Sequence, residues 1–189
     1  MEAFLSSTGA VAIAEIGDKT QLLAFILASR FRRPWLICLG ILLATVVNHF
    51  GAAWLGQWLY GWSQQWLSGN ALSYLLAGSF FAVAAWMLIP DNVEADESSL
   101  YRYGPLVATT VLFFLAEIGD KTQVATVLLA AKYSDFYWVV AGTTLGMMLA
   151  NVPVIWAANY SADKLPMVWI HRISAALFVL FGIATLMNA

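Results

Sequence analysis

The stretch "EIGDKTQ" occupies residues 15–21, and the same seven letters return at residues 117–123. Each copy places two carboxylates and a lysine inside a long apolar segment of the sequence. Ionisable side chains in such surroundings are costly to bury, and they typically bind an ion or line a transport pathway. The doubled heptapeptide therefore bears on both the fold and the function.

The sequence around the two motifs is too apolar for a water-soluble domain. Of 189 residues, 61% are hydrophobic and 11% are charged, and the mean hydropathy is +0.76. A bilayer core about 30 Å thick requires roughly 20 apolar residues in a helix, which satisfies its own backbone hydrogen bonds. The sequence predicts six transmembrane helices, at residues 3–28, 34–60, 71–89, 105–131, 136–160 and 168–187.

The remaining composition excludes several classes of protein. The net charge is −2 and the basic residues form no cluster, so no nucleic-acid partner is expected. Cys38 is the single cysteine, which excludes a disulfide framework and a thiolate metal site. The amino end carries Glu2 instead of a basic segment, so residues 3–28 are interpreted as a true span rather than a signal peptide.

Positive charges predict the orientation of the six spans. Successive loops alternate between the two sides of the membrane. One side collects Arg30, Arg32, Arg33, Arg102, Lys164 and Arg172, whereas the other carries Lys132 alone. By the positive-inside rule the first side is cytoplasmic, which places both termini in the periplasm.

An internal duplication extends beyond the heptapeptide. Its offset of 102 residues also aligns Gly40 with Gly142 and Trp54 with Trp156. Each half then holds three spans, an odd number, so the second half crosses the membrane upside down. The predicted fold is an all-α integral membrane protein with six transmembrane helices as two inverted three-helix repeats, an architecture typical of secondary transporters. The predicted units are residues 1–89, an acidic cytoplasmic linker at 90–104, and residues 105–189.

The polar residues of the spans are candidate metal ligands. Carboxylate and amide oxygens are hard donors, which suit Mn²⁺, Ca²⁺ or Mg²⁺. The candidates are Glu15, Asp18, Gln21, Glu117, Asp120 and Gln123 from the motifs, and Asn48, His49 and Asn151 from the second and fifth spans. The four motif carboxylates and two motif lysines leave two negative charges, which one divalent cation or two protons would neutralise. This equivalence is a simple basis for exchange of metal against protons.

The local geometry of the motif allows two interpretations. In a continuous helix Glu15, Asp18 and Gln21 would lie on one flank. The motif glycines would then serve as close contacts between helices, or they would break the helix and expose carbonyl groups to the ion. For Thr20 and Thr122, hydrogen bonds to their own helix backbone are favoured over metal ligation.

Three functions other than coupled transport are alternatives for such a sequence. Glu15 with Lys19, and Glu117 with Lys121, have the spacing of helical ion pairs that would simply hold helices together. That interpretation leaves the two motif aspartates without partners. A membrane metalloenzyme is disfavoured because the chain has two histidines and no nucleophile beside a base. A passive divalent-cation channel is the nearer alternative, and it would lack coupling to protons.

The pattern Glu-x-Gly-Asp-Lys-Thr, present twice in a chain with six predicted spans, resembles the family of small membrane cation/proton exchangers that includes bacterial manganese exporters and members in the Golgi and chloroplast. The resemblance covers essentially the whole chain. It implies export of Mn²⁺, or of Ca²⁺ as the alternative, in exchange for protons, with the four motif carboxylates carrying the ion. It also implies a protein of the bacterial inner membrane.

We further expect Lys19 and Lys121 to act in gating, by pairing with the carboxylates in alternate states. The expected partners are the transported cation and the lipid bilayer, with no resident cofactor. The sequence leaves open whether the protein forms a homo-oligomer.

Overall fold

A computed structural model of the chain describes residues 1–67, 69–89, 98–157 and 167–187, and within these residues it is entirely helical. The helices are α1 (Glu2–Glu15), α2 (Lys19–Phe31), α3 (Pro34–Ser63), α4 (Gly69–Met87), the 3₁₀ helix η1 (Ser98–Tyr103), α5 (Gly104–Glu117), α6 (Lys121–Lys132), α7 (Phe136–Ala157) and α8 (Met167–Met187). Part of the predicted linker, the end of the fifth predicted span at 158–160, and Lys164 lie outside the described residues.

Within the described residues, three helices are long and apolar enough to cross a membrane: α3, residues Asn70–Met87 of α4, and α7. The segment Ala175–Met187 of α8 is a shorter apolar helix. The first and fourth predicted spans are not continuous helices, because the chain breaks each into a pair, α1 with α2 and α5 with α6. Each member of a pair has 12 to 14 residues and is about 20 Å long, so only the pair together matches a bilayer core.

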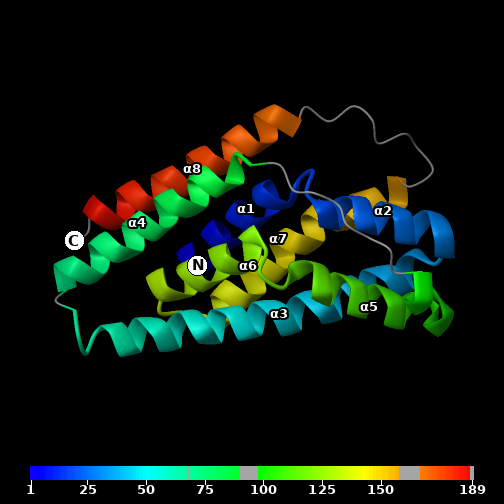
Figure 1. The fold of residues 1–189 in the computed structure, drawn as a ribbon, viewed down its shortest axis with the longest axis horizontal. Coiled ribbons are helices and arrows are strands. Elements are labelled where there is room, and N and C mark those ends of the chain that lie inside the picture. The colour runs from blue at the N-terminus through cyan, green and yellow to red at the C-terminus, as the bar shows by residue number, and fades with distance from the viewer. Residues whose placement is uncertain (68, 90–97, 158–166, 188–189) are drawn as a thin grey trace.

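The two halves of the chain pack against each other in a reciprocal pattern. The first helix of each half packs on the long helix that follows the broken pair of the other half. Thus α1 packs on α7 and α5 packs on α3, while α4 packs on α8. The pair α1 and α2 runs in the opposite direction to the pair α5 and α6, and α3 runs opposite to α7 (Figure 1).

Two glycines aligned by the duplication make the same kind of helix contact. A Cβ atom at Gly40 would lie 2.7 Å from Cβ of Thr109 on α5, and one at Gly142 would lie 3.0 Å from Cβ of Ser7 on α1. Thr109 and Ser7 are themselves 102 residues apart. Lipid gives no hydrophobic driving force between helices, so close packing at small residues holds the two halves together.

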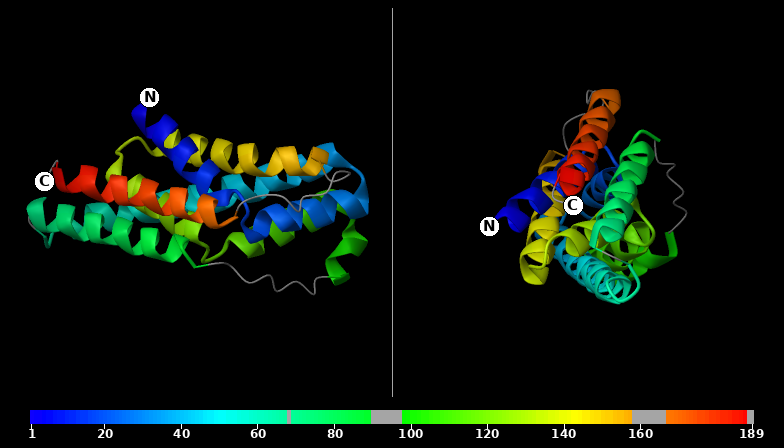
Figure 2. Two further views of the ribbon diagram at one scale, coloured as in Figure 1. Left: turned by 90° about the horizontal axis from the view of Figure 1, so that it is seen from above. Right: turned by 90° about the vertical axis from the view of Figure 1, so that its left-hand side faces the viewer.

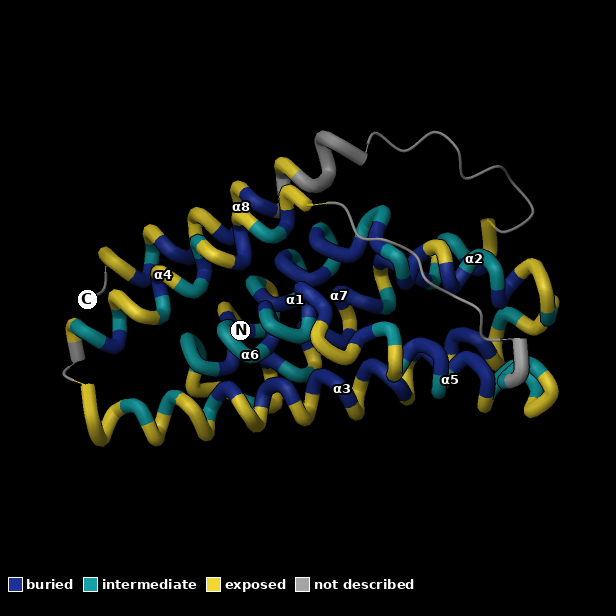
Figure 3. The backbone as a smooth tube through the Cα atoms, viewed as in Figure 1, coloured by how far each residue is buried: buried dark blue, intermediate teal, exposed yellow. Residues whose placement is uncertain are grey.

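The outer surface of the bundle is apolar. On α3 the exposed face carries large apolar side chains, among them Trp35, Leu43, Val47, Trp54 and Trp58. The opposite face of the same helix is buried over most of its length, between Ile37 and Gly56 (Figure 3). This distribution is that of a helix facing lipid on one side and protein on the other.

The two ends of the bundle differ in charge. The guanidinium of Arg30, near the end of α2, lies 4.3 Å from the ring centroid of Tyr101 in η1, so these arginine-bearing turns share one end. Helix α6, whose last residue is Lys132, ends at the other end of the bundle, where the N-terminus and the last turn of α8 also lie (Figure 2).

Candidate metal site

Each heptapeptide forms a break between two helices. Glu15 is the last residue of α1; Ile16 is extended, Gly17 has φ of 83°, and Asp18 caps α2 by accepting a hydrogen bond from the Lys19 N–H at 2.8 Å. The positive φ is a left-handed conformation that glycine adopts without steric cost. The expectation that Glu15, Asp18 and Gln21 share one flank of a continuous helix is therefore wrong.

The second motif repeats this local structure. Glu117 ends α5, Ile118 is extended and Gly119 has φ of 74°. Asp120 caps α6, and its carboxylate accepts from the Thr122 N–H at 3.4 Å. Of the two uses that the sequence left open for the motif glycines, the structure shows the helix break.

The motif glutamines hold the breaks in place. Oε1 of Gln21 accepts the N–H of Gly17 and Oε1 of Gln123 accepts the N–H of Gly119, both at 2.8 Å. Nε2 of Gln21 also donates to the Ala150 carbonyl on α7, at 2.9 Å. Gln21 thus fixes the first break to the other half of the protein.

The glutamates point into the protein and are fully buried. The Thr20 hydroxyl donates to Oε2 of Glu15 at 2.7 Å, and the Thr122 hydroxyl donates to Oε2 of Glu117 at 3.1 Å. The expected bonds from these threonines to their own helix backbone are replaced by bonds to the carboxylates, which the helix break brings within reach. The other oxygen of each glutamate, Oε1, has no hydrogen-bond partner among the described residues.

The two motifs meet. Carboxylate oxygens of Glu15, Asp18 and Asp120 lie within 4.8 Å of one another, and all three residues are buried. Glu117 lies beside this group, within electrostatic range of each of its three members. We refer to these four carboxylates as the acidic cluster.

The two motif lysines occupy different positions. Nζ of Lys19 forms an ion pair with Oδ1 of Asp120 at 2.8 Å, and so links the first motif to the second. Lys121 is buried, and its Nζ donates to the backbone carbonyl of Ile89, just beyond α4. The helical ion pair between Glu15 and Lys19 that the spacing allowed is replaced by this bond across the halves.

The candidate residues on α3 and α7, Asn48, His49 and Asn151, are buried, and the hydrogen bonds that Asn48 and Asn151 donate within the described residues go to groups other than the motif carboxylates. Nδ2 of Asn48 donates to the Phe114 carbonyl on α5 at 3.1 Å. Asn151 donates to Met147 of its own helix, and its Oδ1 has no partner among the described residues. Both ring nitrogens of His49 likewise lack a described partner, and His49 is not part of the group formed by the motif carboxylates.

The predictions from the sequence do not include the helix caps formed by Asp18 and Asp120 or the side-chain contacts with backbone carbonyls. The helix-capping role of Asp18 and Asp120 had a local signal, because aspartate after glycine and before a helical segment is a favoured N-cap. The backbone carbonyls of Ile89 and Ala150 had none, since any residue supplies a carbonyl and only the packing decides which one a side chain reaches.

The acidic cluster has the chemistry of a cation site. Divalent cations bind oxygen ligands at about 2.0–2.6 Å, so two oxygens on opposite sides of such an ion lie about 4–5 Å apart. The carboxylate oxygens of Glu15, Asp18 and Asp120, which lie within 4.8 Å of one another, are close enough for this. Buried carboxylate oxygens without hydrogen bonds are unfavourable unless a cation or a proton neutralises them. The ammonium of Lys19 supplies one positive charge at the edge of the cluster.

Comparison with known proteins gives a consistent result. The family described as "Divalent cation/proton antiporter GDT1" matches residues 3–95 and 105–189. A Vibrio cholerae protein named "Putative manganese exporter" is 50% identical, over 98% of this chain and 90% of its own length. The Saccharomyces cerevisiae protein "Divalent cation/proton antiporter GDT1" is 20% identical, over 100% of this chain and 85% of its own length. A GDT1-like protein of Synechocystis is 26% identical over 98% of the chain. No solved structure matches the chain.

Proposed function

Because this chain belongs to the GDT1 family of divalent cation/proton antiporters, we propose that it exports Mn²⁺ across the bacterial inner membrane in exchange for protons. The family consists of transporters rather than enzymes, and the apolar helices of the structure are those of a membrane protein. The manganese assignment takes its first support from the relative named as a manganese exporter.

One observation carries the proposal: buried carboxylates from two distant motifs gather at one point in the bundle. An acidic cluster in an apolar protein requires cations to neutralise it. The four carboxylates and the two motif lysines together keep two negative charges, which one Mn²⁺ or two protons would neutralise equally. Metal and protons therefore compete for the same oxygens. This competition couples the outward flux of one to the inward flux of the other.

The architecture that we propose is two inverted three-helix repeats that together cross the membrane six times. The matching helices of the halves run in opposite directions, and the contacts of α1 with α7 and of α5 with α3 exchange under the repeat. Broken helices at the meeting point of such repeats are a recurring way to build a site near the bilayer midplane. Alternating access then exposes the acidic cluster to one side at a time, with both termini in the periplasm.

The two motif lysines provide the asymmetry that alternating access requires. In this conformation Lys19 binds Asp120 across the halves, whereas Lys121 binds the Ile89 carbonyl. In the opposite conformation the roles exchange, and Lys121 pairs with the carboxylates of the first motif. An incoming cation must displace the lysine that holds the cluster, so binding and opening are linked.

The ligand set favours a hard divalent cation. The motif carboxylates supply oxygens, and the unpartnered Oδ1 of Asn151 is a further candidate as the site rearranges. Nitrogen from His49 would shift preference from Ca²⁺ towards Mn²⁺. In this conformation Gln21 and Gln123 position the breaks through their bonds to the motif glycines, and rearrangement would have to release them before they could ligate the ion.

The test is Mn²⁺ uptake into inverted membrane vesicles with an imposed pH gradient. We expect uptake that depends on the gradient and is accompanied by proton movement, with Ca²⁺ as a weaker competitor. Mn²⁺ uptake that does not depend on the pH gradient would indicate a channel. Ca²⁺ uptake that exceeds Mn²⁺ uptake would overturn the assignment of Mn²⁺ as the transported metal.

Variants test the shared site. Glu15→Gln and Glu117→Gln each remove one buried negative charge with little change in shape, so each should reduce transport at least a hundredfold in protein that still folds. Asp135→Asn, an exposed residue between α6 and α7, is the matched control and should transport normally. Full activity of either glutamate variant would refute a site shared by both motifs.

A further inference from the structure

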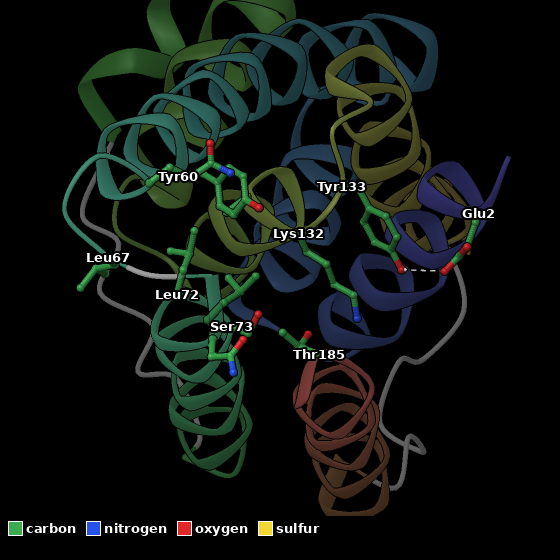
Figure 4. A pocket seen from close by; sticks show the side chains of 12 residues that line it. Glu2, Tyr60, Leu67, Leu72, Ser73, Lys132, Tyr133 and Thr185 are labelled. Carbon is green, nitrogen blue, oxygen red and sulfur yellow. Dashed lines mark hydrogen bonds between the residues drawn. The ribbon is translucent and has the colours of Figure 1, made fainter. Parts of the chain in front are cut away.

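A cavity lies away from the acidic cluster, at the end of the bundle that holds Lys132, the N-terminus and the last turn of α8. Its volume is about 700 Å³, and it lies between α3, α4, α6 and α8 with Glu2 of α1 at its edge (Figure 4). None of the four carboxylates of the cluster lines it. The proposed transport mechanism therefore leaves this cavity without a use.

Among the described residues that line the cavity, Lys132 is the one cation and Glu2 is the one anion. Lys132 points into it, and Nζ donates to the Phe181 carbonyl at 3.3 Å while lying 5.1 Å from the Phe181 ring centroid. No carboxylate lies within ion-pair distance of Lys132 in the part of the chain that the structure describes. Glu2 lies at the rim, where its carboxylate accepts a hydrogen bond from the Tyr133 hydroxyl at 3.5 Å. A ligand with an anionic and a cationic group would complement both.

An apolar groove of about 240 Å³ continues from this cavity. The two share Tyr60, Leu72, Leu76 and Ala131 as lining residues. The groove lies between α3 and α4, which follow each other in the chain but pack together along little of their length. Consecutive helices that stand apart in this way leave a lateral opening towards the bilayer.

The position of the cavity along the bundle is that of a membrane interface. It lies beside the turns that join α3 to α4 and α6 to α7. Trp62 and Trp66 lie where α3 turns towards α4, with ring centroids 6.4 Å apart. Aromatic residues of this kind gather at the level of lipid headgroups. The polar cavity is thus at headgroup level and the apolar groove at acyl-chain level.

From this arrangement we propose that the cavity and groove bind one phospholipid with a zwitterionic phosphoethanolamine headgroup. The phosphate contacts Lys132, the ammonium contacts Glu2, and one acyl chain lies in the groove between α3 and α4. The opposite charges of Lys132 and Glu2 select this headgroup over a purely anionic one, for which Glu2 would be repulsive. A bound lipid fills the space between two helices that pack together along little of their length.

The test is native mass spectrometry of the purified full chain with phosphatidylethanolamine, phosphatidylglycerol or phosphatidylcholine carrying identical acyl chains. We expect one tightly retained phosphatidylethanolamine per protein, with at least fivefold higher occupancy than either other lipid. Lys132→Gln and, independently, Ser79→Trp, which fills the groove from α4, should each reduce that occupancy at least fivefold. Glu2→Gln should shift the preference towards phosphatidylglycerol.

Matched controls separate a specific site from general solvation by lipid. Gly78→Trp adds the same bulk one residue away, at a position with open space around its Cβ, and Arg102→Gln removes a positive charge at the opposite end. Both should retain the lipid. Equal retention of all three lipids, tighter binding of phosphatidylglycerol by the unmodified protein, or unchanged occupancy in both Lys132→Gln and Ser79→Trp would overturn the proposal. The binding measurement does not depend on transport activity.

Discussion

Replacing Lys19 by glutamine should strengthen Mn²⁺ binding. The Lys19 ammonium occupies part of the site that the cation needs, because it lies 2.8 Å from Oδ1 of Asp120. The Asp120 side chain is 2% exposed and that of Lys19 is 25% exposed, so the pair is largely shielded from water. A metal ion entering the acidic cluster must break this bond, whereas in Lys19→Gln that cost is absent and the cluster has one more uncompensated negative charge.

The size of the effect follows from the strength of the bond. A hydrogen bond to a charged group contributes about 1.5–3 kcal/mol net, and each 1.4 kcal/mol changes a dissociation constant about tenfold. We therefore expect about 10- to 100-fold tighter Mn²⁺ binding by Lys19→Gln in isothermal titration calorimetry. Without metal the same variant should be less stable by about 3–5 kcal/mol, because Asp120 is left buried without its partner, and Mn²⁺ should restore that stability.

Two comparisons make the outcome decisive. Lys19→Arg keeps the positive charge and should bind Mn²⁺ about as weakly as the unmodified protein. Arg102→Gln removes an exposed positive charge at the far end and should leave the dissociation constant unchanged. If Lys19→Gln binds Mn²⁺ with equal or lower affinity, then Lys19 does not compete with the metal, and the gating role proposed for the motif lysines is wrong.

Two further predictions concern the break and its hydrogen bonds. Gly119→Ala should lower stability by about 1–2 kcal/mol, because φ of 74° is unfavourable for a residue with a Cβ. Gly9→Ala inside α1 should be neutral or stabilising by up to about 1 kcal/mol. Thermal unfolding in detergent measures both variants, and equal effects would contradict the requirement for glycine at the break. Thr122→Val should weaken Mn²⁺ binding by about 1–3 kcal/mol, because the Thr122 hydroxyl contacts both Glu117 and Asp120. It should also change the pH dependence of Mn²⁺ binding. Thr126→Val is the control, because the Thr126 hydroxyl donates only to a carbonyl of its own helix. If Thr126→Val changes the pH dependence of Mn²⁺ binding by the same amount, then the contacts of Thr122 with the carboxylates are not the cause.

The sequence by itself determined the chemistry and the class of protein. Long apolar segments require lipid around them, and acidic residues repeated within such segments require a cation, whatever the packing. The repeated heptapeptide also determined which residues would correspond, and the contacts of Gly40 and Gly142 follow the same offset. Membership of a cation/proton exchanger family, expected from the motif, is confirmed by the family match.

Only the tertiary structure decided how the motif is used. In a continuous helix the spacing of the motif would direct Glu15 towards Lys19, but Gly17 adopts a left-handed conformation that redirects the chain. Asp18 then caps a helix, Thr20 reaches Glu15, and Lys19 extends to Asp120, 101 residues away in the chain. A glycine permits either conformation at similar energy, so the choice depends on partners from the other half, such as the Ala150 carbonyl that holds Gln21.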